Sequence, residues 1–160
     1  MQRVTVICVG KLKEKFYLDA ASEYVKRLGR YCRLEILELP EQRLPENPAP
    51  AEIERALARE AEAVRARIPA GTAVAALCVE GELRSSEELA ALLERQAGSG
   101  EKGLAFLIGG SYGLHPDLKR GAWLRLSMSP MTFPHHLARV MLLEQLYRSY
   151  QIREGGKYHK

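Results

Sequence analysis

Two loops in the C-terminal third of the chain have the composition and position of a ligand site. Gly109 and Gly110 directly follow the apolar run Leu104–Ile108, and the mostly apolar segment Met128–Phe133 follows a second strand-like run. Glycines at the carboxyl end of a buried strand leave the backbone bare for a ligand, and open α/β sheets bind small molecules at that edge. We therefore expect both loops to line one slot, suited to a flat, partly apolar ligand such as an adenosyl group.

The segment Gly109–Gly113 also resembles a dinucleotide-binding fingerprint, but its spacing is not G-x-G-x-x-G. No acidic residue closes a following strand at the usual distance, so a nicotinamide site is poorly supported. A tight turn that requires positive φ explains the same glycines without any ligand. For this segment taken alone, both a structural turn and a binding loop stay open.

The chain contains four histidines, which raise the question of a metal site. His115 is isolated, His159 is in the C-terminal tail, and the side chains of His135 and His136 diverge by about 100° on a helix. We expect no metal. Solvent exposure or helix capping explains His115 and His136, whereas His135 lies next to the expected slot and is a candidate for orienting a loop or ligand.

The composition indicates one soluble domain that spans residues 1–160. Cys8, Cys32 and Cys78 form no C-x-x-C pair and are interpreted as small buried hydrophobes, which indicates a reducing, cytoplasmic environment. The sequence shows no charged and apolar leader and no run of about 18 apolar residues, so neither secretion nor membrane insertion is expected.

The net charge of +4 is concentrated at the two ends of the chain. Residues 1–33 carry eight basic and three acidic side chains, residues 139–160 carry five and two, and residues 34–138 are net acidic. A solvated helix face explains any single lysine. Two basic ends that converge in the fold would instead fit a polyanion such as RNA.

The expected slot has to be positioned by an α/β fold, because strand-like and helix-like segments alternate along the chain. Strands are predicted at Arg3–Val9, Leu34–Leu39, Ala73–Val79, Leu104–Ile108 and Trp123–Met128. Helices are predicted at 16–28, 51–67, between Ser85 and Gly98, from 115 and at 134–153. The expected architecture is a mostly parallel five-stranded sheet with helices on both faces.

The predicted final helix is apolar over most of its circumference. Its apolar side chains are Leu137, Val140, Met141, Leu142, Leu143, Leu146, Tyr147 and Tyr150. Such a helix is buried on two sides, either at the centre of one monomer or partly against a second subunit. Its polar residues favour the second setting, so we predict a homodimer; they are Arg139, Glu144, Gln145 and Arg148.

Several motifs are shared with one known family. They are Val9-Gly-Lys11, Leu77-Cys-Val-Glu-Gly81, Ile108-Gly-Gly-x-x-Gly113-Leu, Leu126-Ser, Met131-Thr-Phe-Pro-His135, Leu137-x-Arg139, Glu144-Gln-Leu-Tyr147-Arg and Tyr158-His-Lys160. Together they resemble the ribosomal RNA large subunit methyltransferase H family, a minimal SPOUT-class group. The resemblance implies methyl transfer from S-adenosylmethionine to N3 of a pseudouridine in helix 69 of 23S ribosomal RNA. It also implies a homodimer and a C-terminal trefoil knot that holds the cofactor.

The resemblance assigns roles to particular residues of this chain. The cofactor pocket falls at Leu77, Gly109, Met128, Ser129, Pro130, Met131, Thr132 and Phe133. Because the pseudouridine imide must lose its proton, His159 is the candidate base, Arg153 or Lys160 the candidate anion stabiliser, and Tyr158 a candidate for stacking. Phosphate contact and packing explain these tail residues too. RNA contacts are expected at Lys11, Lys13, Lys15, Lys157 and Lys160.

The tail departs from the family pattern at Gly155-Gly-Lys157, where relatives often place a proline before the Tyr-His pair. The position of the tail at rest is therefore open, and two glycines favour flexibility. A non-catalytic, ribosome-associated RNA-binding module is the alternative function, and an NAD-dependent oxidoreductase is a more distant one. Calorimetric titration with S-adenosylmethionine, S-adenosylhomocysteine and NADH would separate the three classes.

Overall fold

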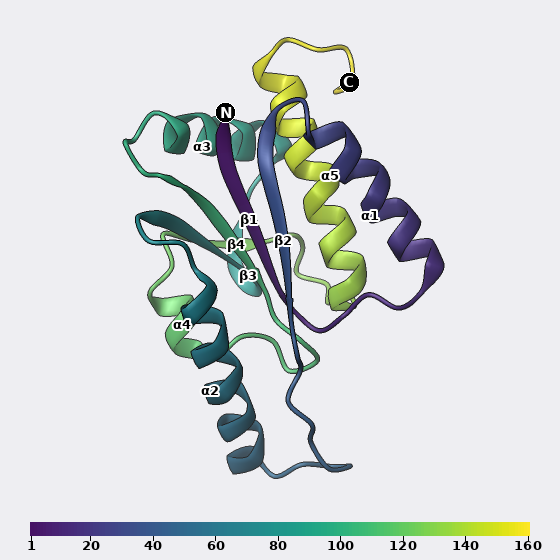
Figure 1. The fold of residues 1–160 in the computed structure, drawn as a ribbon, viewed down its shortest axis with the longest axis vertical. Coiled ribbons are helices and arrows are strands. Elements are labelled where there is room, and N and C mark those ends of the chain that lie inside the picture. Colours follow the sequence, from purple (N-terminus) through teal and green to yellow (C-terminus); the bar gives the residue numbers. More distant parts are fainter.

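The computed structural model describes residues 1–160, and its centre is a five-stranded sheet between two layers of helices (Figure 1). The strands are β1 (Gln2–Val9), β2 (Cys32–Leu39), β3 (Thr72–Leu83), β4 (Gly103–Ile108) and β5 (Leu124–Ser127). The helices are α1 (Lys15–Leu28), α2 (Pro50–Arg67), α3 (Ser86–Ala97), α4 (Pro116–Arg120) and α5 (His135–Arg153). The predicted α/β class and the predicted elements are confirmed, with element ends that differ by a few residues.

The strand order is β2-β1-β4-β3-β5, and all neighbouring strands are parallel. Every residue of β4 is buried, as its continuous apolar sequence predicts for a strand covered on both faces. β2 forms one edge of the sheet and is only partly buried. Because all strands run the same way, their carboxyl ends meet at one edge, where a ligand site is expected.

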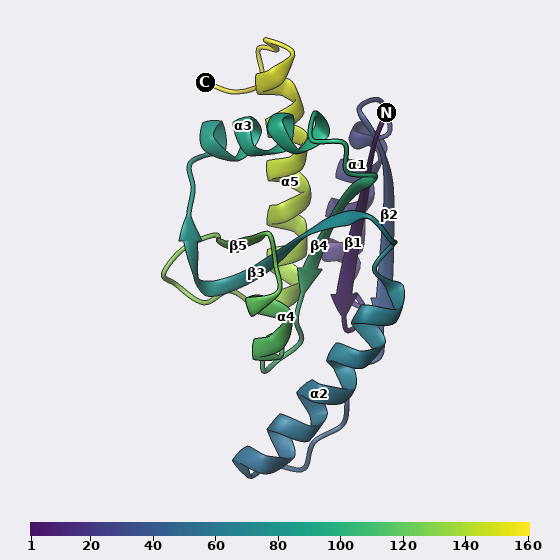
Figure 2. The same ribbon diagram turned by 90° about the vertical axis from the view of Figure 1, so that its left-hand side faces the viewer.

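Helices cover both faces of the sheet, as predicted. α1, α3 and α5 pack on one face and α2 and α4 on the other (Figures 1 and 2). An apolar core lies on each face of the sheet, and successive strand residues point into opposite cores. Val6 and Phe106 face α1, α3 and α5, while Ile7 and Leu107 face α2 and α4. α2 projects beyond the sheet, and both chain termini lie at the end of the molecule opposite to it (Figure 2).

β3 is longer than predicted, because it runs past Val79 to Leu83. Its pairing with β5 shifts register between Leu77 and Glu82, as at a β-bulge. Gly81 lies so close to β5 that a Cβ there would stand 2.8 Å from the Arg125 carbonyl oxygen. The irregularity releases residues 78–80 from the regular ladder on the side where the candidate site lies.

α5 lies between α1 and α3 on the sheet, and none of its residues is fully exposed. Burial on two sides therefore arises within one chain. Arg139 is buried and pairs with Glu38, and Gln145 accepts a hydrogen bond from Ser86 of α3. Arg139 and Gln145 therefore no longer argue for a second subunit, because both have partners in their own chain. The homodimer stays a prediction on other grounds.

Candidate active site

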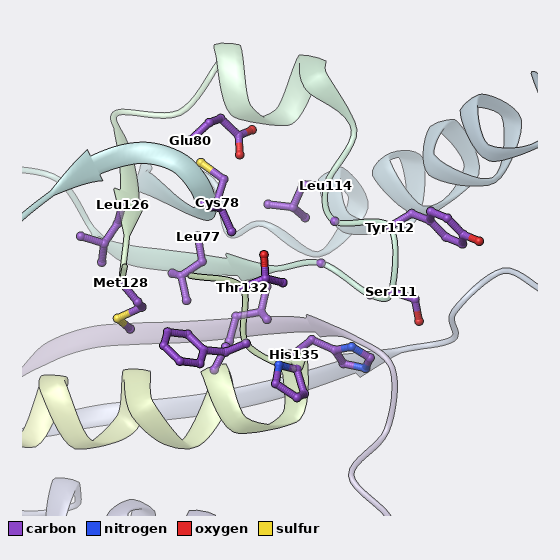
Figure 3. Close-up of a pocket in the computed structure, with 18 of the residues that line it drawn as sticks. Leu77, Cys78, Glu80, Ser111, Tyr112, Leu114, Leu126, Met128, Thr132 and His135 are labelled. Atoms are coloured by element: carbon purple, nitrogen blue, oxygen red, sulfur yellow. The ribbon is translucent and has the colours of Figure 1, made fainter. Parts of the chain in front are cut away.

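A cavity of about 670 Å³ opens at the carboxyl edge of the sheet (Figure 3). Three neighbouring strands contribute to its lining: Leu77–Glu80 within β3, Ile108–Leu114 at and after the end of β4, and most of Leu126–His135 at and after the end of β5. Its volume lies within the usual range for small-molecule sites. The two loops expected to form one slot therefore do line a single cavity.

Seven of the eight predicted cofactor residues line the cavity: Leu77, Gly109, Met128, Ser129, Met131, Thr132 and Phe133. Pro130 does not. It is exposed at a turn in which Ser129 Oγ accepts the Met131 N–H at 3.0 Å. The sequence interpretation missed Cys78, Glu80, Tyr112 and Lys119, which also line the cavity. Cys78 and Glu80 depend on the irregularity in β3 and Lys119 on the packing of α4, for which the sequence has no periodic signal, whereas Tyr112 lies in the Gly109–Gly113 loop itself.

The glycine loop has a different physical basis from the one expected. A Cβ at Gly109 would overlap the backbone carbonyl of Gly113, so Gly109 is required by the loop itself rather than by a ligand. The loop is held from outside, because Glu41 Oε1 accepts the Ser111 N–H at 2.7 Å. Gly113 has φ +78° and no heavy atom within 4 Å of a Cβ built there. The loop thus combines a tight turn with an open, side-chain-free surface at Gly113.

The second loop forms an apolar wall that is fixed to β3. Ser127 Oγ donates to the Val79 carbonyl at 2.9 Å and so ties the end of β5 to the β3 extension. Leu77, Met128 and Thr132 lie near one another in the close-up (Figure 3). An apolar surface bordered by backbone groups and the hydroxyls of Ser129 and Thr132 fits a flat heteroaromatic ring. The residues present are therefore suited to an adenosyl group.

Three side chains that line the cavity carry or can carry charge, namely Glu80, Lys119 and His135. Lys119 Nζ donates to Glu80 Oε1 at 2.5 Å, and this bond lowers the pKa of Glu80. Burial lowers the pKa of His135, and the charges of nearby His136 add to the effect. His135 is therefore neutral at pH 7. Glu80 and His135 stand on opposite sides of the cavity (Figure 3).

The basic loop Lys11–Lys15 is anchored beside the cavity by Arg139. One Arg139 nitrogen donates to Glu38 Oε2 at 2.7 Å and another to the Gly10 carbonyl at 3.2 Å. The same Glu38 oxygen accepts the Leu12 N–H at 3.0 Å. Burial acts to raise the pKa of Glu38, but the bonds from Leu12 and Arg139 outweigh it and lower that pKa.

This anchoring leaves the three lysines of the loop, Lys11, Lys13 and Lys15, exposed to solvent. The loop lies close to the cavity, since a Cβ at Gly10 would stand 3.2 Å from His135 Nε2. The position suits a polyanion that approaches the cavity. RNA contact by these lysines stays a prediction.

The C-terminal tail folds back on α5 and α3. Tyr158 donates to Glu144 Oε1 at 3.0 Å, and His159 lies 3.1 Å from Arg148 and 2.7 Å from Glu87. Burial and the bond to Glu144 raise the pKa of Tyr158 to about 12, so its hydroxyl stays protonated. The tail, whose rest position the sequence left open, thus lies in a polar cluster with Glu144 and Arg148 of α5 and Glu87 of α3.

α5 separates this tail from the cavity. The cavity contains His135 at the start of the helix, whereas Arg153 is about 28 Å further along at its end, and Tyr158 and His159 contact Glu144 and Arg148 in between. Within one chain, the structure therefore does not bring the predicted catalytic His159, Arg153 and Tyr158 to the cavity. Lys157 and Lys160 do not line it either. Arg153 instead lies over the ring of Tyr150, 5.2 Å from its centroid.

The remaining histidines and cysteines have structural positions. His115 is the N-cap of α4, where its Nδ1 accepts the Asp117 N–H at 3.0 Å, so the capping interpretation is confirmed. Cys8 and Cys32 are buried as free thiols, whereas Cys78 is half-buried at the cavity. No three His, Cys, Asp or Glu side chains are grouped as metal ligands. No helix is both long and apolar enough to cross a membrane.

The chain was compared with known families and proteins. A family model described as "Predicted SPOUT methyltransferase" matches residues 2–159. Two proteins named "Ribosomal RNA large subunit methyltransferase H" are similar to this chain over its whole length. The one from Acetivibrio thermocellus is 48% identical and the one from Pelotomaculum thermopropionicum 46%, each over 99% of this chain and 99% of the relative.

Two solved structures share the fold at low sequence identity. A probable methyltransferase from Bordetella pertussis aligns with a TM-score of 0.55 and 19% identity, over 92% of this chain and 96% of that one. A probable methylase family protein from Haemophilus influenzae aligns with a TM-score of 0.51 and 13% identity, over 99% of this chain and 70% of that one. These likenesses support the fold alone.

Proposed function

The chain belongs to the SPOUT methyltransferase family, and from this premise we propose that it methylates large-subunit ribosomal RNA. Specifically, we propose transfer of the methyl group of S-adenosylmethionine to N3 of a pseudouridine in helix 69 of 23S ribosomal RNA. The observation that carries the proposal is the cavity at the carboxyl edge of the sheet, lined by seven residues that the family resemblance assigns to the cofactor. A ribosomal substrate implies that the protein works in the cytoplasm.

The proposed cofactor supplies a methyl group on a sulfonium, which is already activated for transfer. The chain then has to hold donor and acceptor in line, and such positioning is worth about 7 to 11 kcal/mol. Leu77, Met128 and Phe133 would contact the adenine, while the bare backbone at Gly113 leaves room beside the glycine loop. His135 is neutral and would present a hydrogen-bond acceptor or donor without adding charge.

The pseudouridine N3–H has to lose its proton as the new N–C bond forms. We propose His159 as the acceptor, Arg153 or Lys160 as the group that stabilises the anion, and Tyr158 as a stacking partner. Because none of these residues lines the cavity of its own chain, and Tyr158 and His159 are held by Glu144, Arg148 and Glu87, they would act at the cavity of a second subunit. This separation now supports the homodimer.

In such a dimer, Lys157 and Lys160 of one subunit and Lys11, Lys13 and Lys15 of the other would face the same RNA. We also propose that residues 1–160 form one domain and that its C-terminal part is knotted. In support, residues of β3 and the segments after β4 and β5 enclose the cavity together, and α5 returns from edge strand β5 to pack between α1 and α3.

The test is methylation of ribosomes that lack this modification. Isotope-labelled S-adenosylmethionine should transfer its label to helix 69, and reverse transcription should stop there, since an N3-methyl group blocks Watson–Crick pairing. Excess S-adenosylhomocysteine should suppress both signals. The alternative, a non-catalytic RNA-binding module, predicts ribosome binding without label transfer and without calorimetric binding of S-adenosylhomocysteine. An oxidoreductase predicts binding of NADH.

A further inference from the structure

The cavity wall contains one pair of opposite charges, formed by Glu80 and Lys119. Glu80 comes from the irregular part of β3 and Lys119 from α4, and their charged atoms are 2.5 Å apart. The side chains are 62% and 24% exposed. Ion pairs this exposed contribute little to stability, so opening the pair costs the fold little. Both groups are therefore available to a ligand.

No other lining group offers charge at neutral pH. Burial lowers the pKa of His135, which keeps its ring neutral. Burial raises the pKa of the Cys78 thiol, and the Glu80 carboxylate adds to the rise, so Cys78 is neutral as well. Glu80 itself stays ionised, because Lys119 lowers its pKa. Lys119 and Glu80 are thus the one place where the cavity matches a ligand that carries both signs of charge.

We propose that Glu80 and Lys119 together bind the amino-acid end of the methyl donor, with Glu80 taking its α-ammonium and Lys119 its α-carboxylate. The assignment rests on the proposed function. With a zwitterion, Glu80 exchanges the ammonium of Lys119 for the ammonium of the ligand, and Lys119 exchanges the carboxylate of Glu80 for the carboxylate of the ligand. No charge is then left unpaired. A ribose diol would need only the carboxylate and would leave Lys119 unmatched. The apolar wall at Leu77 and Met128 remains for the adenine.

Two ligands that share the nucleoside separate the amino-acid end from the rest. S-adenosylhomocysteine carries it, and 5′-methylthioadenosine lacks it. In calorimetric titration of the full chain, Glu80→Gln and Lys119→Met should each weaken binding of S-adenosylhomocysteine about 5- to 20-fold, as expected for loss of a partly exposed charged hydrogen bond. Binding of 5′-methylthioadenosine should stay within about twofold of wild type, because the apolar wall is unchanged.

A third ligand distinguishes the two charges. Decarboxylated S-adenosylmethionine keeps the ammonium, so Glu80→Gln should weaken its binding while Lys119→Met should not. The matched control is Glu82→Gln. Glu82 also forms an ion pair at 2.5 Å, with Arg84, is 56% exposed and lies two residues along β3, but it does not line the cavity. Its substitution should leave the affinity for all three ligands unchanged.

Three results would overturn the assignment. Equal loss of both adenosine ligands in Glu80→Gln would place Glu80 at the nucleoside. Unchanged binding of S-adenosylhomocysteine in both single variants would remove the pair from the site while leaving the proposed function intact. A wild-type protein that binds neither ligand would overturn the proposed function and the assignment with it.

Discussion

Gly109 has no room for a side chain, because the Gly113 carbonyl occupies the position of its Cβ. Gly109→Ala should therefore displace the glycine loop and destabilise the protein by about 1 to 3 kcal/mol, as overpacking does. It should also weaken the binding of S-adenosylhomocysteine at least about tenfold. Calorimetry and thermal melting measure the two effects.

Gly29→Ala is the control for this change, since a Cβ at Gly29 meets the Lys26 carbonyl oxygen at an ordinary 3.4 Å. It should leave ligand binding as in the wild type. Wild-type affinity in Gly109→Ala would remove the glycine loop from the cofactor site.

His135 makes stability depend on pH. Its folded pKa lies below the unfolded value of 6.5, mainly through burial, with His136 and Arg139 adding to the shift and Glu41 and Glu14 opposing it. As the pH falls, His135 is protonated in the unfolded chain before it is protonated in the folded chain. The share of the free energy of unfolding that comes from neutral His135 is therefore complete above pH 6.5 and is lost below it. Urea unfolding at about pH 7.5 and about pH 5.5 should show a smaller loss for His135→Gln than for wild type. An equal loss would mean that His135 titrates normally.

At the scale of elements, the Arg139–Glu38 pair joins α5, β2 and the basic loop. Arg139 is 4% exposed and Glu38 is 34% exposed. Glu38→Ala leaves a buried cation without its carboxylate and should lower the free energy of unfolding by about 2 to 4 kcal/mol. This loss is smaller than for breaking a fully buried ion pair, because Glu38 is partly hydrated. Arg139→Met should cost less, since water can reach the remaining carboxylate.

Urea unfolding of the two single variants and of the double variant measures this coupling. The double variant should lose less free energy of unfolding than the two single variants lose together. Asp19→Asn breaks the exposed pair with Lys15 and should change stability by under about 1 kcal/mol. Strict additivity of Glu38→Ala and Arg139→Met would show that the two residues do not support each other.

At the scale of the whole molecule, no residue of the tail lines the cavity of its own chain, so the proposed reaction needs two chains. Sedimentation at micromolar concentration should give about twice the 17.9 kDa mass of one chain. A monomer with full methyltransferase activity would contradict both the dimer and the shared site. In that case the base would have to lie near His135.

Removal of residues 157–160 should leave binding of S-adenosylhomocysteine intact but abolish methylation, because the cavity contains none of these residues. A heterodimer of this truncated chain with Gly109→Ala, purified through two different tags, combines one intact cavity with one intact tail. It should recover about half of the wild-type activity, since one of two symmetric sites is complete. A heterodimer as inactive as either parent would exclude a site shared in this way.

Much of the fold could be predicted from local sequence. The run Leu104–Ile108 is apolar throughout because β4 is covered on both faces. Ser85 and Glu88 form the predicted capping box, with bonds of 3.1 and 2.9 Å. Strand ends followed by glycines or by Met128–Phe133 indicated one ligand slot, because parallel strands place their carboxyl ends at one edge. Periodicity and capping depend on neighbours a few residues away, so the sequence determines them directly.

Tertiary structure alone decided the contacts between distant residues. The sequence suggested that Arg139 faces a second subunit, yet strand order places it against Glu38 of its own chain, 101 positions away. Glu80 reaches the cavity through the break in β3, and Gly109 is required by Gly113 rather than by a ligand. The tail is held outside the cavity by its contacts with Glu144 and Arg148 of α5 and Glu87 of α3. Such features arise from packing between elements, and the periodicity of one segment carries no information about which other segment will lie against it.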